Sequence, residues 1–328
     1  MRILKWSLAV LLAVLGAGFA IGYTPDTDPV AMRAKYGSSA SRYLTLAPGL
    51  TVHVRDQGLR NGPALVLVHG SNASLHTWEP WVTRLQDRYR IVTMDLPGHG
   101  LTGASPDGRY DYTAYAGIVD QVMQALGVSK AVIGGNSMGG GVAWTYALAH
   151  PAKVEGLILV DAAGAPGGVS RKPPIGFRIA RMPILRETAR IITPRSVFEA
   201  SLKSSVYDPT FATPAMVDRY WELNRYPGNR AATISRFAEA HSRTSARADQ
   251  MSAIKAPVLI LWGETDTLIP VASAHWFHKA LPGSRLIIYP RIGHIPMEES
   301  PDQTAQDVRR WLDEAVVRPQ EASDSRAP

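Results

Sequence analysis

The fold is decided by Val132-Ile-Gly-Gly-Asn-Ser-Met-Gly-Gly-Gly141, where an apolar β-like segment runs into an apolar-periodic helix. One serine, Ser137, stands between Gly135 and Gly139, which is the G-x-S-x-G pattern of a sharp strand-to-helix turn. Bulky side chains at the two glycine positions would collide where helix and strand cross. The pattern predicts a nucleophile elbow that holds the Ser137 hydroxyl near the positive end of the following helix. The alternative is a glycine-rich turn with an incidental serine.

A serine hydroxyl is a poor nucleophile at neutral pH and needs a base that is itself oriented by a carboxylate. Two downstream strands are followed by such residues: Asp266 comes after Pro257–Gly263, and His294 comes after Arg285–Tyr289. In an open α/β sheet, ligands bind at the carboxyl ends of the strands, where Ser137 also lies. We therefore predict Ser137 as the nucleophile and His294 as the general base and then acid. Asp266 is predicted to fix the imidazole tautomer.

Other carboxylates and histidines compete for these roles. Glu264 lies in the same loop as Asp266 but nearer the strand end, and Asp161 follows the apolar run Gly156–Val160. Asp161 would be the acid in a variant topology. The remaining histidines have structural explanations as turn, helix-end, surface-helix or insert residues, and they are His99, His150, His275, His278 and His241.

Acyl transfer also needs hydrogen-bond donors for the developing oxyanion, and removing one such donor costs about 10²–10³ in rate. One donor is expected from the backbone N–H of the residue after the nucleophile, which is Met138. The second is expected after the third strand, which is the apolar run Pro63–Gly70. We assign it to the backbone N–H of Ser71, with Asn72 as the alternative. His69 is interpreted as a packing and turn residue.

Taken together, these motifs resemble the α/β-hydrolase superfamily over roughly residues 40 to 315. The resemblance is to the branch of esterases, lipase-like enzymes and meta-cleavage-product hydrolases, which break carbon–carbon bonds. It implies a hydrolase whose serine, acid and histidine follow in that order along the chain. The motifs that carry it are His69-Gly70, Asp95-Leu-Pro-Gly-His-Gly100, Gly135-Asn-Ser-Met-Gly139, Gly263-Glu-Thr-Asp266 and Gly293-His294.

Two departures from related patterns narrow the expected reaction. Epoxide hydrolases and haloalkane dehalogenases carry aspartate at the elbow, where this chain has Ser137. Meta-cleavage hydrolases usually have Gly-Pro-Gly after the third strand and tryptophan after the histidine, where this chain has Ser71-Asn-Ala-Ser74 and Ile295. We therefore expect a serine hydrolase that cleaves a small-molecule carboxylic ester through an acyl-enzyme. The alternatives are a carbon–carbon bond hydrolase and a non-catalytic ligand-binding receptor of the same fold.

The pattern of strands and helices predicts an α/β fold with an eight-stranded, mostly parallel, doubly wound sheet. An opening hairpin is expected over 42–55, followed by strands near 64–69, 90–95, 130–135, 155–160, 257–262 and 285–289. Helical patterns cover 77–88, 111–126, 138–149 and 302–316. The segment 164–250 is not needed by the sheet and is long enough for a helical cap over the active site. The core then consists of residues 40–163 and 251–316.

The pattern of residues 1–22 predicts that the protein is exported from the cytoplasm. A basic start is followed by Trp6–Gly22, which has no charged residue and fits either a signal anchor or a cleaved signal peptide. Because the basic side stays in the cytoplasm, the catalytic domain is expected outside it, membrane-anchored or released. Within the cap, Pro174–Ile192 interleaves arginines with large apolar residues. That pattern is typical of an amphipathic cap helix or of a helix in contact with a membrane surface.

Composition sets the remaining limits. The chain has 328 residues, of which 45% are hydrophobic, no cysteine, and a formal net charge of +7. This length allows one sizeable domain with a cap, and the charge favours anionic lipid surfaces. The chain has no nucleic-acid motif, no phosphate-binding loop and no zinc-spaced histidine pair, so no nucleic acid, cofactor or metal is expected. Residues 317–328 predict a disordered tail. The sequence leaves the oligomeric state open.

Overall fold

The computed structural model describes residues 22–47, 49–168, 187–238 and 245–317, and the single residues 6, 7, 16, 178 and 182. Its centre is an eight-stranded sheet with the strand order β1-β2-β4-β3-β5-β6-β7-β8. β1 pairs antiparallel with β2, and β2 pairs antiparallel with β4, whereas the remaining pairs are parallel. The predicted eight-stranded, mostly parallel sheet is therefore confirmed. The strands are β1 (Ser41–Leu46), β2 (Leu50–Gly58), β3 (Ala64–Val68), β4 (Arg90–Met94), β5 (Ala131–Asn136), β6 (Val154–Val160), β7 (Val258–Gly263) and β8 (Arg285–Tyr289).

The central parallel strands are apolar because helices cover both faces of the sheet. Every residue of β5 and of β7 is buried. In the register of the sheet, Asn136 lies beside Val160, and Val160 lies beside Leu261. The carboxyl ends of β5, β6 and β7 are therefore level, and the loops that follow them meet at one edge.

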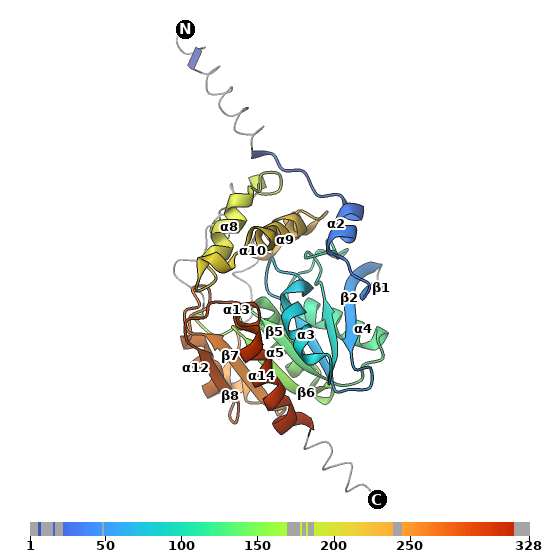
Figure 1. Cartoon of the computed structure of the whole chain (residues 1–328), viewed down its shortest axis with the longest axis vertical. Coiled ribbons are helices and arrows are strands. Elements are labelled where there is room, and N and C mark those ends of the chain that lie inside the picture. Colours follow the sequence, from blue (N-terminus) through green and yellow to red (C-terminus); the bar gives the residue numbers. More distant parts are fainter. Residues whose placement is uncertain are drawn as a thin grey trace, which may run out of the picture.

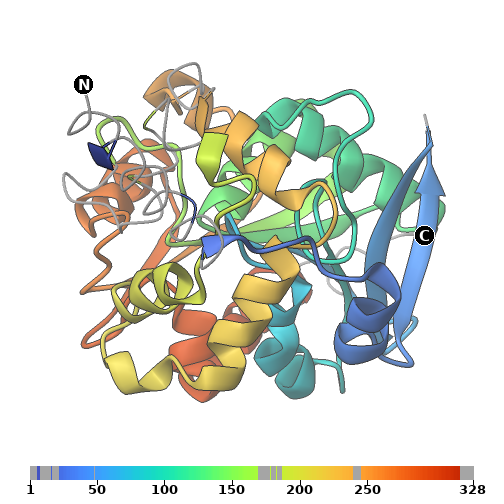
Figure 2. The same cartoon turned by 90° about the horizontal axis from the view of Figure 1, so that it is seen from above.

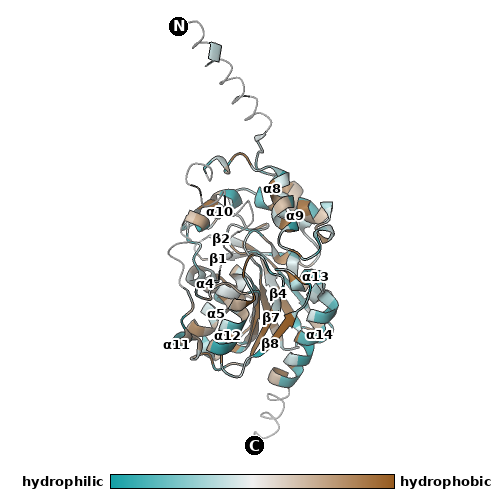
Figure 3. Ribbon diagram, turned by 90° about the vertical axis from the view of Figure 1, so that its left-hand side faces the viewer, coloured by the Kyte–Doolittle hydropathy of each residue, from teal (hydrophilic) through white to brown (hydrophobic). Residues whose placement is uncertain are grey.

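The covering helices form one layer on each side of the sheet. Figure 3 shows α4, α5, α11 and α12 on one side of the strands and α13 and α14 on the other. Separate apolar clusters lie under the two layers. The helices of the first layer are α4 (Tyr112–Ala125), α5 (Met138–Ala149), α11 (Ala248–Met251) and α12 (Ala272–Ala280). Those of the second layer are α3 (Glu79–Leu85), α13 (Pro296–Glu299) and α14 (Pro301–Leu312).

Local signals account for where several helices begin and end. The Asp111 carboxylate accepts the Ala114 N–H at 2.9 Å, which caps the first turn of α4. The helix expected over 77–88 is divided into a 3₁₀ turn, η1 (Leu75–Trp78), and α3, which has proline in its first turn. The last helix ends at Leu312 and continues as a π-helical turn over Asp313–Val317. Two further 3₁₀ turns are η2 (Pro151–Lys153) and η3 (Pro209–Phe211).

Three helices between β6 and β7 lie together at one end of the sheet (Figure 1). They are α8 (Arg195–Lys203), α9 (Pro214–Asn224) and α10 (Asn229–Ala238), within the predicted cap segment. Seen from above, they lie across the sheet, and the β1–β2 hairpin forms one outer edge (Figure 2). A short N-terminal helix, α2 (Pro29–Tyr36), packs against α9, and its Lys35 Nζ contacts the Glu222 carboxylate at 2.7 Å.

Several sequence predictions fall outside the described residues. They concern most of the segment 1–22, most of Pro174–Ile192, His241, and the tail after residue 317. Within the part of the chain that the structure describes, no helix combines the length and the apolar character needed to cross a membrane.

Candidate active site

Ser137 lies at the junction of β5 and α5 with backbone angles φ +54° and ψ −118°. A non-glycine residue in this region is strained, and such strain is typical of functional turns. The two flanking glycines explain how the turn is possible. A Cβ on Gly135 would lie 2.1 Å from the Gly139 oxygen, and a Cβ on Gly139 would lie 2.1 Å from the Val68 oxygen. The G-x-S-x-G pattern is thus required by backbone contact on both sides of the serine.

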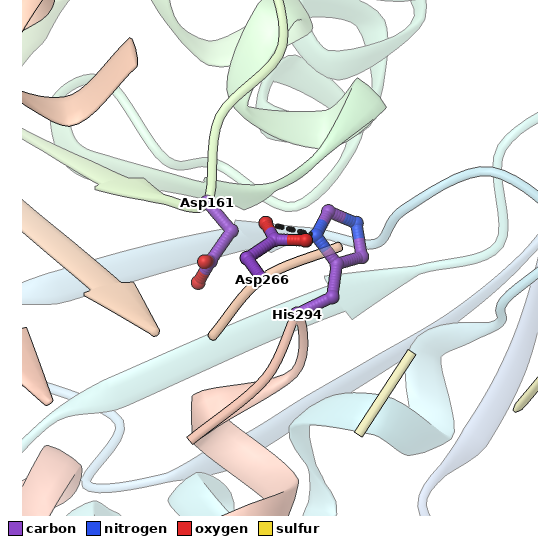
Figure 4. A group of neighbouring side chains, drawn as sticks. All are labelled: Asp161, Asp266 and His294. Atoms are coloured by element: carbon purple, nitrogen blue, oxygen red, sulfur yellow. Dashed lines mark hydrogen bonds and ion pairs between the residues drawn. The ribbon is translucent and has the colours of Figure 1, made fainter. Parts of the chain in front are cut away.

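Asp266 and His294 lie side by side in the loops after β7 and β8 (Figure 4). The His294 Nδ1 is 2.6 Å from the Asp266 Oδ2. The other carboxylate oxygen accepts the backbone N–H groups of Leu268 and Ile269 at 2.7 and 3.1 Å. Asp266 is buried, whereas Glu264, its competitor in the same loop, is exposed. The structure therefore brings Asp266, and not Glu264, to the histidine.

The histidine loop is tied to the serine elbow. The Asn136 side-chain amide donates to the backbone carbonyls of His294 and Val160 at 3.0 and 3.2 Å. Ser137 and His294 line the same cavity. The three residues predicted as nucleophile, base and acid thus lie around one cavity at the carboxyl edge of the sheet. Their catalytic roles stay a prediction at this point.

Asp161 is a second carboxyl group beside this pair (Figure 4). Its backbone has φ +45°, its Oδ1 accepts the Gly263 N–H at 3.0 Å, and its Oδ2 is buried without a hydrogen-bond partner. Burial, and after it the negative charge of Asp266, raises the pKa of Asp161 well above its ordinary value. The carboxylate partner of His294 is Asp266, whereas the hydrogen bond of Asp161 is to the Gly263 N–H.

The same three side chains have donor atoms suited to a metal ion. One ligand atom each from Asp161, Asp266 and His294 lies within 4.8 Å of the others. However, the Asp266 and His294 atoms that face each other already share a hydrogen bond of 2.6 Å. A metal ion at this place would have to replace that bond, so the donor set fits an acid–histidine pair better than a metal centre.

The two predicted oxyanion donors come from segments that meet at Ser137. Met138 is the first residue of α5, so its backbone N–H has no carbonyl partner within the helix. Ser71 lines the cavity in the loop after β3. A Cβ on the preceding Gly70 would lie 3.3 Å from the Ser137 Cβ, which shows how closely this loop approaches the elbow. Both donor roles stay predictions.

The other described histidines have structural surroundings. His69 is buried, and its Nε2 accepts the Leu96 N–H at 3.0 Å, which agrees with a packing and turn role. The His99 ring lies 4.8 Å from that of His69, and burial lowers the pKa of both imidazoles. His275 and His278 lie in α12 and are exposed. Among the histidines that the structure describes, His294 alone lines the cavity.

The cavity has a volume of about 170 Å³ and is lined mainly by apolar side chains. Most of them come from the cap, which therefore forms the wall opposite Ser137. The apolar lining residues from the cap and its approach are Ala189, Ile192, Pro194, Val197, Phe198, Leu202, Ile234 and Phe237, and Leu268 and Ile295 come from the two catalytic loops.

Charged residues that the sequence analysis did not single out connect the cap to the catalytic loops. Glu298 accepts from Arg219 and Tyr220 of α9 at 2.8 and 3.1 Å. Glu299 accepts the Gly293 N–H and, from the cap, the Tyr207 N–H at 2.8 Å. The only signal for the two glutamates is their position shortly after His294. Arg236, in α10, belongs to no sequence motif.

Comparison with known proteins shows the family of the chain. A family model described as the alpha/beta hydrolase fold matches residues 63–301, which is more than half of the chain. The chain belongs to the α/β-hydrolase fold family, and it is a hydrolase. It is 31% identical over 277 residues to an uncharacterized protein of Mycobacterium tuberculosis, covering 80% of each chain. It is 26% identical to Lipase 1 of Psychrobacter immobilis, covering 82% of each.

A solved structure resembles almost the whole chain. The crystal structure of a membrane phospholipase A, described as a bacterial virulence factor, is 27% identical in sequence and superposes with a TM-score of 0.73. The similarity covers 96% of this chain and 99% of the phospholipase.

Proposed function

We propose that this protein is a serine hydrolase that cleaves carboxylic esters through an acyl-enzyme formed on Ser137. The observation that carries the proposal is the 2.6 Å contact between Asp266 and His294 beside the cavity that Ser137 lines. A histidine held by a buried carboxylate is oriented as a base, and a serine in a strained elbow is presented to substrate. The similarity to lipases and to a phospholipase supports the same reaction class.

In the first half of the reaction, the Ser137 oxygen attacks the ester carbonyl carbon while His294 takes the hydroxyl proton. Asp266 keeps the Nδ1 proton on the imidazole and stabilises the imidazolium that forms. The carbonyl oxygen becomes an oxyanion, and the backbone N–H groups of Ser71 and Met138 donate to it. The tetrahedral intermediate then collapses. His294 returns the proton to the alcohol oxygen, and the alcohol leaves.

In the second half, water attacks the acyl-enzyme. His294 accepts a proton from this water, and the same donors stabilise the second oxyanion. Collapse breaks the bond between the acyl carbon and the Ser137 oxygen, which takes back the proton from the imidazole. A carboxylic acid is released, and the enzyme returns to its starting state.

The lining of the cavity supports an apolar acyl group as the substrate part that is bound there. Cap residues such as Val197, Phe198 and Phe237 offer no charge to a ligand. Removing apolar surface from water contributes about 25 cal/mol per Å², so an alkyl chain gains affinity with each methylene that fits. We propose esters with medium or longer acyl chains as the preferred substrates.

For location, we propose that residues 1–22 carry the catalytic domain outside the cytoplasm, either as a membrane anchor or as an export signal. The first described residues after this segment support an arrangement in which an anchor leads directly to the cap. The Thr24 N–H donates to the Ile191 carbonyl at 2.9 Å. Arg230 of α10 donates to the Thr24 carbonyl and to the Asp26 carboxylate, both at 2.6 Å.

The location is tested by fractionating cells that express the full chain or the chain without residues 1–22. The anchor model predicts the full chain in the membrane fraction and its catalytic domain open to protease from outside. The export model predicts a shortened, soluble protein outside the cytoplasm. Full-length protein in the cytoplasmic fraction would overturn both.

The reaction is tested by following p-nitrophenol release from esters with acyl chains of two to sixteen carbons. Ser137→Ala and His294→Ala should abolish turnover, while Glu264→Gln, which changes an exposed carboxylate in the same loop, should leave it intact. Turnover of a coloured dienoate without ester cleavage would instead assign the carbon–carbon hydrolase reaction. Tight binding of esters without turnover would assign the receptor function.

A further inference from the structure

Arg236 lies in the third turn of α10 and is 1% exposed. Its guanidinium extends from the cap to the loop after β3 and to the start of α5. The Nη1 atom donates to the Ser71 hydroxyl at 2.7 Å and contacts the Met138 sulfur at 3.4 Å. The Arg236 Nη1 atom therefore contacts the side chains of Ser71 and Met138. The backbone N–H groups of these two residues are the ones proposed to bind the oxyanion.

The second nitrogen holds the adjoining residue of the same loop. Nη2 donates to the Asn72 side-chain oxygen at 3.0 Å and to the Thr233 hydroxyl at 2.9 Å. The Thr233 hydroxyl also donates to the Asn72 oxygen, at 3.1 Å. Asn72 has φ +60°, a left-handed conformation that asparagine adopts more readily than other non-glycine residues, and the two hydrogen bonds to its side-chain oxygen hold it there. The planar guanidinium of Arg236, from the cap, thus fixes the loop after β3.

From these contacts we propose that Arg236 is a positioning residue that aligns the Ser71 and Met138 backbone donors for the oxyanion. The proposal rests on the proposed acyl-enzyme reaction. Arg236 does not line the cavity, so it acts through the two residues that it contacts. Its geometry suits this task because a guanidinium donates along several fixed directions in one plane, whereas an ammonium is a single point charge.

The position of the charge strengthens the argument. Arg236 approaches the buried His69 and His99 closely enough that its positive charge helps to lower the pKa of both imidazoles, with burial as the larger cause. A cation in this water-poor layer is weakly screened and favours negative charge on nearby atoms. The oxyanion is formed in the transition state and not in the bound ester. Arg236 should therefore affect kcat and leave KM nearly unchanged.

The experiment compares Arg236→Met, which keeps the stem, and Arg236→Lys, which keeps the charge, with the full-length enzyme. We expect kcat for p-nitrophenyl esters to fall about 100-fold in Arg236→Met, the effect of losing one oxyanion donor, and less in Arg236→Lys. KM should stay within about threefold. A trifluoromethyl ketone, which forms a tetrahedral adduct with the serine, should bind more weakly by the same factor as kcat falls.

Two further variants separate positioning from a general loss of structure. Arg195→Met removes a cap arginine that pairs with Asp218 at 2.5 Å on α9, away from the oxyanion loop, and should leave kcat unchanged. Ser71→Ala keeps the backbone donor but removes an acceptor of Arg236. Because both changes break the same contact, the double variant Ser71→Ala/Arg236→Met should be less impaired than the product of the single effects predicts.

The results distinguish this proposal from the proposed reaction. If the wild-type protein has no ester turnover, the proposed reaction is wrong. If the wild-type is active and Arg236→Met retains its kcat and its affinity for the ketone, only the role of Arg236 is wrong. A rise in KM alone would also overturn that role. Should Arg236→Met not fold, an unchanged kcat in Ser71→Ala would decide against it.

Discussion

Two buried carboxyl groups lie next to His294, and they differ in their hydrogen-bond partners. Asp266 accepts two backbone N–H groups through one oxygen and contacts the imidazole through the other. Asp161 has one oxygen that accepts from Gly263 and one buried oxygen with no partner, and burial raises its pKa. Of the two, only Asp266 is placed to accept the imidazole Nδ1 proton, at 2.6 Å.

This difference predicts unequal effects of the same substitution. Asp266→Asn should lower kcat by about 10⁴-fold, because an amide no longer holds the required tautomer. Asp161→Asn should change kcat by no more than about threefold, since the amide keeps an acceptor for the Gly263 N–H and the His294–Asp266 contact is untouched. Steady-state kinetics on one ester checks both. Equal losses in the two variants would contradict the assignment of Asp266 as the acid.

At the residue scale, the sequence allowed some of this to be predicted. The order of Ser137, Asp266 and His294 after their strands follows from apolar runs that end in turn residues. The raised pKa of Asp161 and the contacts of Arg236 depend on groups distant in the chain. No local pattern encodes such neighbours, and spacing alone left Asp161 open as an alternative acid.

The element that defines the site is the turn between β5 and α5. Its glycines have different surroundings from a glycine in the middle of α4. A Cβ on Gly139 would meet the Val68 and His69 carbonyl oxygens at 2.1 and 2.6 Å, whereas a Cβ on Gly117 would have no atom within 4 Å. Both glycines are helical, so helix propensity alone would rank them equally.

We therefore expect Gly139→Ala to destabilise the protein by more than about 3 kcal/mol, through backbone overlap that cannot relax. Gly117→Ala should stabilise it by about 0.5–1 kcal/mol, because alanine is the better helix former. The free energy of unfolding from urea denaturation measures both changes. Similar values for the two variants would mean that the elbow is looser than described.

The positions of the helices and strands were largely predictable, because apolar residues recur at different intervals along a buried parallel strand and along an amphipathic helix. The contacts between the cap and the catalytic loops were not predictable. Helix α9 reaches the histidine loop through Glu298, and α10 reaches the oxyanion loop through Arg236. These links join segments between 79 and 165 residues apart, so they follow from the folded arrangement rather than from any motif.

For the molecule as a whole, the buried histidines make stability depend on pH. His69 and His99 have pKa values lowered below 6.5 by burial. Between the folded pKa and 6.5 the unfolded chain binds more protons than the folded one. The free energy of unfolding therefore falls as pH drops below about 6.5 and is fully restored above it. Asp161, whose pKa is raised from 3.8 by burial, acts in the opposite direction, since its contribution to stability is lost as pH rises through its folded pKa.

Because these contributions oppose each other, the test compares slopes between variants. His99→Asn keeps a donor for the Pro97 carbonyl, which lies 3.2 Å from the imidazole Nδ1, and it cannot titrate. Urea unfolding from pH 7.5 to pH 5 should show a smaller loss of stability in this variant than in the wild type. The same loss in both proteins would show that His99 does not carry the acid sensitivity.

The proposed role of Ser137 as the nucleophile is decided by covalent labelling. A fluorophosphonate probe is incubated with the wild type, Ser137→Ala and His294→Ala, and the modified peptide is identified by mass spectrometry. We predict a single adduct on Ser137 in the wild type, none in Ser137→Ala, and strongly slowed labelling in His294→Ala. Folded wild-type protein that stays unlabelled, or that carries its adduct on another serine, would contradict the account.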